Sequence, residues 1–560
     1  MNLNRITKGL TVKGLFTLDF NNVYSQLIDN DYAVYDKGTA DANGNYAVTA
    51  VGVDKKTNQQ TIKNYLMNFN RTITGYVAVN YNRTFGAHAI SAVAMSNARE
   101  YVQKGLFQSD KVFNYGGQVN YVFNDKYIID AGILTQGSSK LSVGKKFASA
   151  PSFGAAWLVS NEDFLKGNAV VNYLKIRGSY GTILNDNFTL GKYKGYYLNE
   201  LNYANGVQVN YGNGTSSNKA TVFNSLGNNI DWQQRKEMVV GFDSYLLNNK
   251  TWLEASYFNS ESANMVTEMK NRVSAVLGGV SVFENYNTTV NKGFEVGVKH
   301  TEKMGDFTLA VGVNYMLSNS EIIKIDEPFY NLATNMHLTK VGASSDASWG
   351  LMTAGLYAPE DFDGAGKLLN TLPVPTYGTV RAGDIKYVDY NKDNVINADD
   401  NSVLGLSSNN SQYSFDIDLK FKNWQLYVLG IGQMGGTGYT NSAYYWFKGK
   451  EAKYSEIALK AYDPLNPNPN AEYPRLSLSE GKNNYINSTF WMYDKSYFSL
   501  SAVQLAYNMK FGVKSPVKDL KVFGRGSNLL TLAKDKKIQD LNYLFAPKSR
   551  VFTLGLIASF

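Results

Sequence analysis

The segment from Asp389 to Asp400 carries side-chain oxygens at a spacing that suits a calcium ion. With Asp389 as the first position, oxygen ligands stand at positions 1, 3, 5, 9 and 12, the pattern of an EF-hand-type calcium loop. Ca²⁺ is a hard cation that takes about six to eight oxygens. The predicted ligands are Asp389, Asn391, Asp393, the carbonyl of Val395, Asn397 directly or through water, and Asp400.

Two positions of this loop depart from the EF-hand pattern. Asn394 stands at position 6, where Gly is preferred, but Asn tolerates the left-handed conformation better than other non-Gly residues. Asp400 at position 12 is shorter than the usual Glu and would weaken bidentate capture. The alternative is a polar turn rich in Asx residues. Because no flanking helices suggest a sensor, we expect residues 384–400 to form an extracellular loop that structural Ca²⁺ stiffens.

No other set of residues indicates chemistry. The chain has no Cys, which excludes disulfides, thiol catalysis and thiolate metal sites. Its three histidines, His88, His300 and His337, are far apart, and adjacent carboxylates such as Glu360 and Asp361 lie on loops. The net charge of +8 is spread without a Lys/Arg block, which argues against nucleic acid as a partner. We therefore expect no enzyme.

The element that best indicates where this protein resides is the last strand. Residues Phe552, Leu554, Leu556, Ala558 and Phe560 alternate with Val551, Thr553, Gly555, Ile557 and Ser559. A period of two that ends on an aromatic residue predicts a strand with one apolar face. Such a strand suits the closing seam of a bacterial outer-membrane barrel, where no edge is left unpaired in lipid. Phe560 is thus predicted to take part in barrel closure.

Composition agrees with a large all-β protein. The 560 residues include 40 Tyr, 29 Phe and 7 Trp, and Gly is abundant at 49 while Pro is scarce at 11, as expected for long strands joined by polar turns. No run of about 18 apolar residues, the length of a membrane-spanning helix, is found. A membrane protein of this composition must cross with strands that are apolar at every second position.

Alternating segments recur along the chain, separated by short turns and by long polar stretches such as residues 30–59 and 448–487. Short turns on one side and long loops on the other are typical of outer-membrane barrels. A soluble propeller or sandwich array is the alternative, but no fixed sequence period is present and the strands are long. Predicted strands include Gly117 to Phe123, Tyr127 to Leu134, Trp252 to Phe258, Phe307 to Leu317, Tyr413 to Phe421 and Trp424 to Ile431.

Several aromatic residues allow two interpretations. Side chains such as Trp349, Tyr357 and Trp491 could stack on sugar rings. In a barrel, however, aromatic girdles at the membrane interface are the commoner explanation. The same two interpretations apply to Tyr444, Tyr445 and Trp446.

A series of ordered blocks resembles the SusC/RagA type of TonB-linked outer-membrane proteins. The first runs Asn120-Tyr-Val-Phe-Asn-Asp-Lys-Tyr127, followed by Gly137-Ser-Ser-Lys140, Ala155-Ala-Trp157 and Asn161-Glu-Asp-Phe164. Further blocks are Leu174-Lys-Ile-Arg177, Gly241-Phe-Asp243, Asn291-Lys-Gly-Phe-Glu295, Gly383-Asp384, Asp494-Lys-Ser-Tyr497 and Asn528-Leu-Leu-Thr531. Each block alone is weak, but their order over most of the chain is specific.

The resemblance implies a large antiparallel transmembrane barrel closed by an amino-terminal plug. It also implies import of oligosaccharides or peptides through the outer membrane, with a SusD-like surface lipoprotein as lid and the TonB-ExbB-ExbD complex supplying energy. Residues 1–560 are expected to be an amino-terminally incomplete barrel, the carboxyl-terminal part of the family's barrel, with the signal peptide and plug missing. Local departures, such as Gln233 after Trp232 in place of Glu, indicate a divergent member. The alternative is a structural or remnant outer-membrane barrel that transports nothing.

Overall fold

The computed structural model describes most of the chain, and every structural statement below concerns these residues. They are residues 2–29, 33–52, 61–103, 108–187, 200–202, 208–210, 217–219, 222–225, 230–271, 282–328, 332–449, 453–478, 481–512, 515–540 and 549–560. No helix among them is long and apolar enough to cross a membrane.

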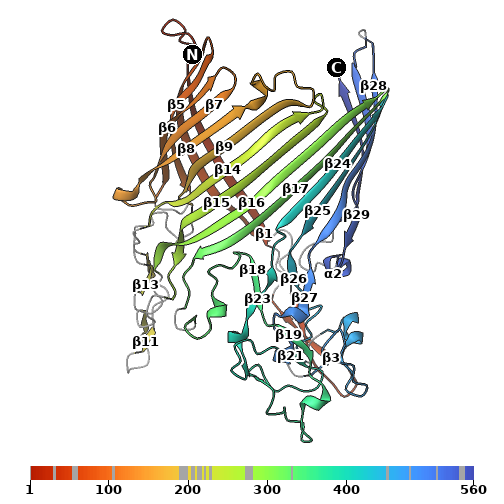
Figure 1. Cartoon of the computed structure of the whole chain (residues 1–560). Helices are drawn as coiled ribbons and strands as arrows, with labels where there is room; N and C mark the ends of the chain where they lie inside the picture. The colour runs from red at the N-terminus through yellow and green to blue at the C-terminus, as the bar shows by residue number, and fades with distance from the viewer. Residues whose placement is uncertain are drawn as a thin grey trace.

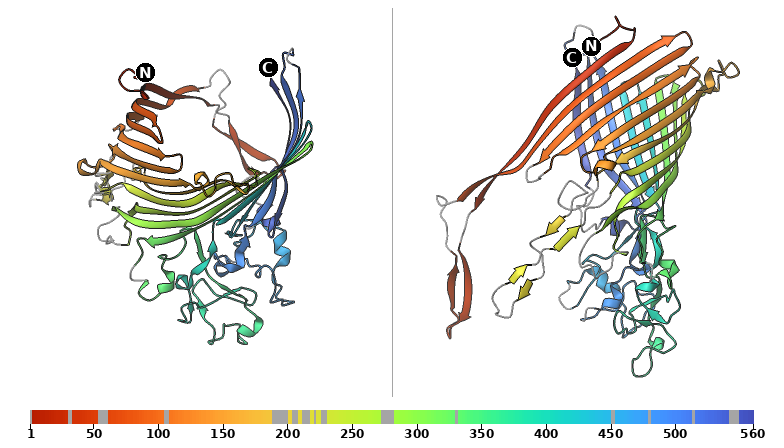
Figure 2. Two further views of the ribbon diagram at one scale, coloured as in Figure 1. Left: turned by 45° about the horizontal axis from the view of Figure 1, so that its top comes forward. Right: turned by 90° about the vertical axis from the view of Figure 1, so that its left-hand side faces the viewer.

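One antiparallel sheet of 16 strands dominates the molecule, and each strand pairs with the next sheet strand along the chain. The strands tilt strongly and the sheet curls into a trough (Figures 1 and 2). In order they are β1 (Leu10–Asp29), β4 (Thr61–Phe85), β5 (His88–Gln103), β6 (Asp110–Phe123), β7 (Tyr127–Ser138), β8 (Phe147–Leu158), β9 (Val171–Asn185), β14 (Gln233–Leu246), β15 (Thr251–Glu268), β16 (Phe283–Met304), β17 (Phe307–Lys324), β24 (Ser411–Phe421), β25 (Trp424–Met434), β28 (Tyr497–Lys510), β29 (Asp519–Ala533) and β30 (Val551–Ser559).

This architecture confirms the predicted all-β class. The predicted strands are present, but several are longer than the alternation indicates: β15 continues to Glu268 and β17 to Lys324. Beyond the lipid a strand needs no apolar face, so its extension carries no period-two signal. Sequence patterning therefore locates the strands but underestimates their length.

The two ends of the sheet differ in their connections. Tight turns join strands at one end, for example through Gly86, Gly305 and Lys422, whose positive φ angles of 57°, 63° and 51° allow the chain to reverse within a few residues. Long connections leave the other end, which by the asymmetry of such barrels is extracellular. They hold the helix α2 (Lys536–Asp540) and small two-stranded sheets. The strands of these small sheets are β2 (Val34–Ala40), β3 (Tyr46–Val51), β10 (Glu200–Asn202), β11 (Gln208–Asn210), β12 (Ser217–Lys219), β13 (Val222–Ser225), β18 (Ala347–Gly350), β19 (Thr353–Leu356), β20 (Val374–Pro375), β21 (Ile385–Tyr387), β22 (Val395–Ile396), β23 (Ser402–Leu406), β26 (Thr437–Tyr439) and β27 (Met492–Asp494).

The sheet has an outward face that is apolar and an inner face that is polar. On β30, for example, Phe552, Leu554 and Leu556 are 76%, 90% and 70% exposed and share one face. The register aligns such residues from strand to strand, so that Leu556 stands opposite Val522 on β29. Apolar side chains exposed at every second position are those a sheet presents to lipid, and the polar face then lines the lumen.

The end strands β1 and β30 each pair with a single strand among the described residues. Phe560, just after β30, is 78% exposed. The predicted role of Phe560 in barrel closure is not tested by this arrangement and stays a prediction.

Aromatic side chains gather on the outward face at the tight-turn end. The rings of Tyr127 and Trp157 stack with centroids 6.5 Å apart, and those of Trp424 and Tyr507 meet edge to face at 4.8 Å. Rings with an apolar body and a polar edge suit the interface between lipid and water. These residues form the girdle of the barrel at this end.

A carboxylate fixes part of this girdle. Glu162, in the turn after β8, accepts hydrogen bonds from Tyr127 Oη at 2.7 Å, Trp157 Nε1 at 3.0 Å and Lys126 Nζ at 2.8 Å. The Lys126 ammonium, together with the two ring donors, lowers the pKa of Glu162 to about 2. Residues from three separate sequence blocks thus meet at one carboxylate.

We expect this contact to make the tight-turn end sensitive to acid. Because the pKa of Glu162 is depressed on folding, its contribution is present above the ordinary value of 4.5 and is lost as pH falls toward 2. Glu162→Gln should remove that acid-dependent loss of thermal stability, measured by heat-modifiability of the outer-membrane protein between pH 6 and 2. Asp163→Asn is the matched control, since Asp163 is an exposed neighbour. An unchanged pH profile in the Glu162→Gln variant would contradict the assignment.

Candidate functional site

A row of polar side chains crosses the inner face of four neighbouring strands, β15, β16, β17 and β24. Glu254 on β15 stands opposite Gly297 on β16, Gly297 opposite Asn314 on β17, and Asn314 opposite Ser414 on β24. The register brings these residues together although more than 100 positions separate the first from the last. Asn314 Nδ2 donates to Ser414 Oγ at 3.3 Å.

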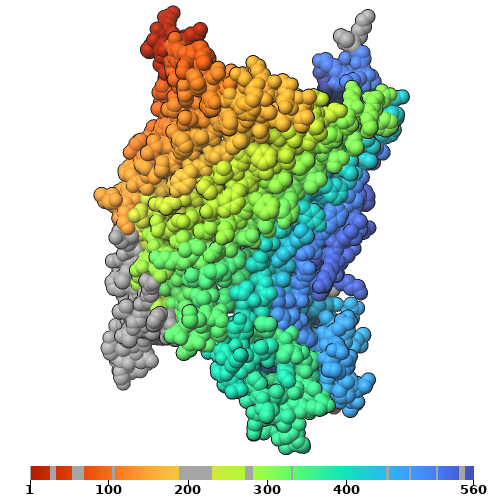
Figure 3. All heavy atoms as spheres, in the orientation of Figure 1, coloured from red at the N-terminus to blue at the C-terminus, as the bar shows by residue number. Residues whose placement is uncertain are grey.

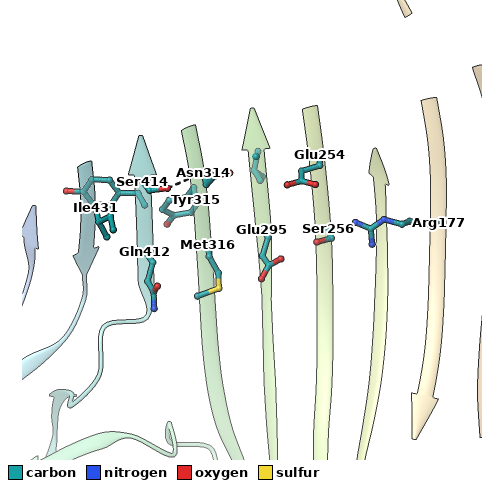
Figure 4. Close-up of a pocket in the computed structure, with 13 residues that line it drawn as sticks. Arg177, Glu254, Ser256, Glu295, Asn314, Tyr315, Met316, Gln412, Ser414 and Ile431 are labelled. Atoms are coloured by element: carbon teal, nitrogen blue, oxygen red, sulfur yellow. Dashed lines mark hydrogen bonds between the residues drawn. The ribbon is translucent and has the colours of Figure 1, made fainter. Parts of the chain in front are cut away.

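This row and its neighbour line a pocket of about 420 Å³ on the inner wall. Figure 4 shows Glu254 and Glu295 on adjacent strands, with Arg177 on one side and Gln412 and Ser414 on the other. Gly297 is essential to this shape, because a Cβ there would lie 2.9 Å from Glu254 Oε1 and 3.0 Å from Asn314 Oδ1. The missing side chain lets the carboxylate and the amide converge.

The charges around the pocket are unevenly matched. Arg177 Nε lies 3.1 Å from each carboxylate oxygen of Asp243, and Lys299 Nζ lies 3.7 Å from Asp416 Oδ2. In contrast, neither Glu254 nor Glu295 forms an ion pair within the described part of the chain. On the inner wall, the carboxylates of Glu254 and Glu295 are therefore available to accept hydrogen bonds from a solute. Beside them, the charge of Arg177 is already balanced by Asp243.

At the extracellular end, two long connections fold together into what we call the loop unit, residues 344–407 and 437–494. The unit projects from the sheet below β17 and β25 (Figures 1 and 3). Its two halves share one hydrophobic core, although they are separate in sequence. The core residues are Leu351, Leu356, Ile385, Tyr387, Ile396, Phe447, Tyr462, Tyr473, Tyr485 and Trp491.

A buried ion pair joins the two halves of the loop unit. Asp384, 2% exposed, lies 2.8 Å from Arg475 Nε and accepts a hydrogen bond from Arg475 Nη2 at 3.0 Å. Asn484 donates to the same carboxylate at 2.7 Å and accepts the N–H of Ile385 at 2.9 Å. A buried charge is tolerated when its oxygens are satisfied in this way. Asp384 thus serves as the polar centre of the loop unit.

Two of the loop aromatics, Trp491 and Tyr357, take neither of the roles that their residue types indicate. Trp491 and Tyr357 are 3% and 2% exposed, and Trp491 Nε1 donates to the carbonyl of Asn484 at 2.8 Å. Burial, with Asp361 and Asp384 nearby, raises the pKa of Tyr357 to about 12, so its hydroxyl stays neutral. The girdle interpretation is therefore wrong for these two residues, because they fill the interior of a folded unit outside the membrane. No hydropathy period marks such a core in the sequence.

The predicted calcium ligands lie within the loop unit and form a compact turn. Asp389 accepts the N–H groups of Lys392 at 2.7 Å and Asn394 at 2.8 Å, and Asn394 adopts φ +65° as position 6 requires. Asp393 Oδ1 accepts the N–H of Val395 at 2.8 Å. Asn391 Oδ1 accepts the N–H of Asp393 at 3.1 Å. Loop positions 1 to 7 therefore curl around the oxygen side chains.

The end of the loop closes back on its start. Asp400, fully buried, accepts the N–H of Tyr390 at 2.8 Å and that of Asn397 at 2.9 Å. Ile396 packs into the core of the loop unit. Within the described ranges, no three His, Cys, Asp or Glu side chains group closely enough to hold a metal ion. Asp389 Oδ1 accepts the N–H groups of both Lys392 and Asp393, at 2.7 and 3.2 Å. Asp389 Oδ2, Asp393 Oδ1 and Asp400 Oδ2 each accept a single backbone N–H, which leaves each of them a lone pair of the kind that binds Ca²⁺.

Sequence comparison shows that the chain is similar to TonB-dependent receptors. It is 26% identical over 482 residues to TonB-dependent receptor P26 of Formosa agariphila, covering 80% of this chain and 46% of the relative. It is 23% identical over 418 residues to TonB-dependent receptor SusC of Bacteroides thetaiotaomicron, covering 71% and 38%. The chain thus spans about half the length, or less, of the curated relatives it matches. No family model matches.

Structure comparison gives the same fold. The RagAB peptide transporter matches with a TM-score of 0.70 at 15% identity, over 99% of this chain and 60% of that one. The RagAB peptide importer in its open-open state matches with a TM-score of 0.72 at 16% identity, over 99% and 59%. These matches confirm the predicted fold: the sheet has the same architecture as the β-barrel of these two proteins.

We expect the buried ion pair to hold the loop unit together. Asp384→Asn leaves the Arg475 charge without its partner, and breaking a buried pair costs about 3 to 5 kcal/mol. The variant should make the loop unit open to added protease on intact cells. The matched control is Glu472→Gln, which breaks the exposed Lys460–Glu472 pair of the same unit and costs at most about 1 kcal/mol. Equal cleavage of the two variants would refute the role of Asp384.

Proposed function

We propose that this chain belongs to the SusC/RagA type of TonB-dependent receptors and forms the barrel wall of an importer for oligosaccharides or peptides. It is an outer-membrane β-barrel protein of a transport family. The proposed pathway runs along the inner face, past the pocket that Glu254 and Glu295 border. No covalent chemistry is required, because a polar solute needs only hydrogen-bonding partners that replace its water.

The observation that supports transport is the pair of carboxylates on the inner wall without cationic partners. A wall that served structure alone would be expected to neutralise such charges, as Arg177 neutralises Asp243. Open acceptors suit the hydroxyl groups of sugars and the amides of peptides equally well. The competing proposal is a structural or remnant barrel that transports nothing. It does not explain why these two carboxylates lack cationic partners.

Two partners complete the proposed importer. We propose that a SusD-like surface lipoprotein covers the extracellular end, where the loop unit offers a pre-folded surface beside the lumen. The TonB-ExbB-ExbD complex would supply energy through a plug segment that the relatives' greater length has room for. Captured solute would enter when the plug moves, and the inner wall would guide it to the periplasm.

Substitution of the two carboxylates tests the transport pathway. Glu254→Gln with Glu295→Gln, in the whole protein in its native membrane, should lower uptake of the nutrient that supports growth by about tenfold, as expected from the loss of one charge-assisted hydrogen bond. Uptake is measured with labelled oligosaccharide or peptide mixtures, and abundance in the membrane should not change.

The control for this experiment lies on the other face of the sheet, on β15 and β17. Glu261→Gln with Glu321→Gln removes two outward carboxylates, each paired with a lysine. If both double variants take up nutrient like the unmodified protein, the inner-wall pathway is wrong. If deletion of the whole gene also leaves uptake unchanged for every nutrient, the structural barrel is favoured.

We also propose that the Asp389 to Asp400 turn binds Ca²⁺ and so stiffens the loop unit. The proposal is supported by the left-handed Asn394 and by oxygens that converge on one turn. Calcium should slow cleavage of the loop unit by protease, and EGTA should reverse the effect. Asp389→Asn with Asp393→Asn should abolish this calcium dependence, whereas Asp363→Asn, in a neighbouring turn, should not. Cleavage that is independent of calcium in every variant would favour the plain Asx-rich turn.

A further inference from the structure

A groove crosses the outward face of the sheet near its extracellular end. It runs over strands β4 to β8, the orange part of Figure 2, and has a volume of about 520 Å³. Its floor is low at Gly75 and Ala98, which supply little or no side chain, while the ring of Phe147 lies over Gly137. Ile73, Phe113 and Phe147 form its walls. A Cβ added at Gly75 would meet nothing within 4 Å, so the groove is open at this point.

The register shows that this groove faces the lipid. Ala98 stands opposite Phe113, Phe113 opposite Gly137, and Gly137 opposite Phe147, so the residues form one row on one face. Phe113 and Phe147 are 44% and 54% exposed, as are other apolar residues of that face. An apolar trough of this kind is shaped for a hydrocarbon chain.

A cluster of charges closes the extracellular end of the groove. Lys111 Nζ lies 3.4 Å from Glu100 Oε1, and Arg71 Nη2 lies 3.7 Å from Glu100 Oε2. Lys146 lines the same groove. The cluster thus holds three cations and one carboxylate. The Lys111 side chain is 64% exposed and can reach a ligand without breaking the fold.

The excess of positive charge distinguishes this groove from two other places on the described outward face. Two other lysines on the outward face near the same end each have one carboxylate: Lys236 lies 3.9 Å from Glu261, and Lys292 lies 3.3 Å from Glu321. Those pairs are neutral, whereas the groove cluster is not. A surplus of cations at the head of an apolar groove is complementary to an anionic headgroup that carries acyl chains.

We propose that this groove is a binding site for lipid A, the phosphorylated glycolipid of the outer leaflet. An acyl chain lies along Ile73, Phe113 and Phe147, and a phosphate contacts Lys111 and Lys146, with Arg71 behind them. The groove is at the depth of the outer leaflet because the charges stand where β5 and β6 meet their extracellular connection. Lipid bound there would cover strands β4 to β8 and keep this part of the wall from sticking to other apolar surfaces.

The test counts lipid A on the whole protein purified from its own outer membrane in mild detergent. Native mass spectrometry should find at least one lipid A retained, and Lys111→Gln with Lys146→Gln should lower the retained fraction by about tenfold. Lys236→Gln with Lys292→Gln is the matched control, with the same charge change on the same face. Equal retention by all three proteins, or equal loss in both double variants, would overturn the site.

A second variant tests the apolar part without changing charge. Gly75→Leu fills the groove where there is open space, and it should also lower lipid A retention. Gly178→Leu on β9, which points to the same face outside the groove, should not. Unchanged retention in Gly75→Leu would refute the acyl-chain contact.

Adding different lipids to delipidated protein identifies which molecule occupies the groove. Vesicles of lipid A should restore binding to delipidated protein, whereas vesicles of phosphatidylglycerol and inorganic phosphate should not. Restoration by phosphatidylglycerol or by phosphate alone would overturn the assignment to lipid A. A copurifying protein that replaces the lipid mass would overturn it as well, in favour of an acidic partner.

Discussion

The constraint on which this structure depends is that no backbone N–H or C=O group is left unpaired in a medium without water. A continuous antiparallel sheet meets that demand, since every internal strand bonds to a neighbour on both sides. Side chains must then alternate between lipid and lumen, because successive residues of a strand point to opposite faces. The register of the strands therefore decides which distant residues share a surface, as it does for Glu254 and Ser414.

Outside the membrane, the loop unit folds as a water-soluble domain does, with its apolar side chains buried in a core. The loop unit buries aromatic and aliphatic side chains around Asp384, whose charge is satisfied by Arg475 and Asn484. Its strands are only two to five residues long, and its order comes from packing rather than from a ladder of hydrogen bonds. A rigid unit of this kind gives a barrel a defined extracellular surface, which flexible loops would not provide.

The two faces of the sheet use glycine for the same physical purpose but in different chemical settings. On the inner face, Gly297 lets the Glu254 carboxylate approach Asn314, and the result is a polar pocket. On the outward face, Gly75 lowers the floor of an apolar groove that ends at a cluster of cations. The missing Cβ makes room for neighbouring polar side chains at Gly297 and leaves open space at Gly75, and the surrounding side chains decide whether the bound molecule is a hydrated solute or a lipid.

The sequence by itself determined the class of the fold and its location, because the period-two alternation of segments such as Phe552 to Phe560 is a direct consequence of lipid on one face. It also located the oxygens of Asp389 to Asp400, since the ligands of such a loop are local in sequence. Only the tertiary structure decided that Trp491 and Tyr357 lie in a core, because that core joins two loops with no periodic pattern. The inner pocket and the outward groove were likewise beyond the sequence: both arise from residues on several strands, and pairing register, which places them side by side, is a property of the folded sheet.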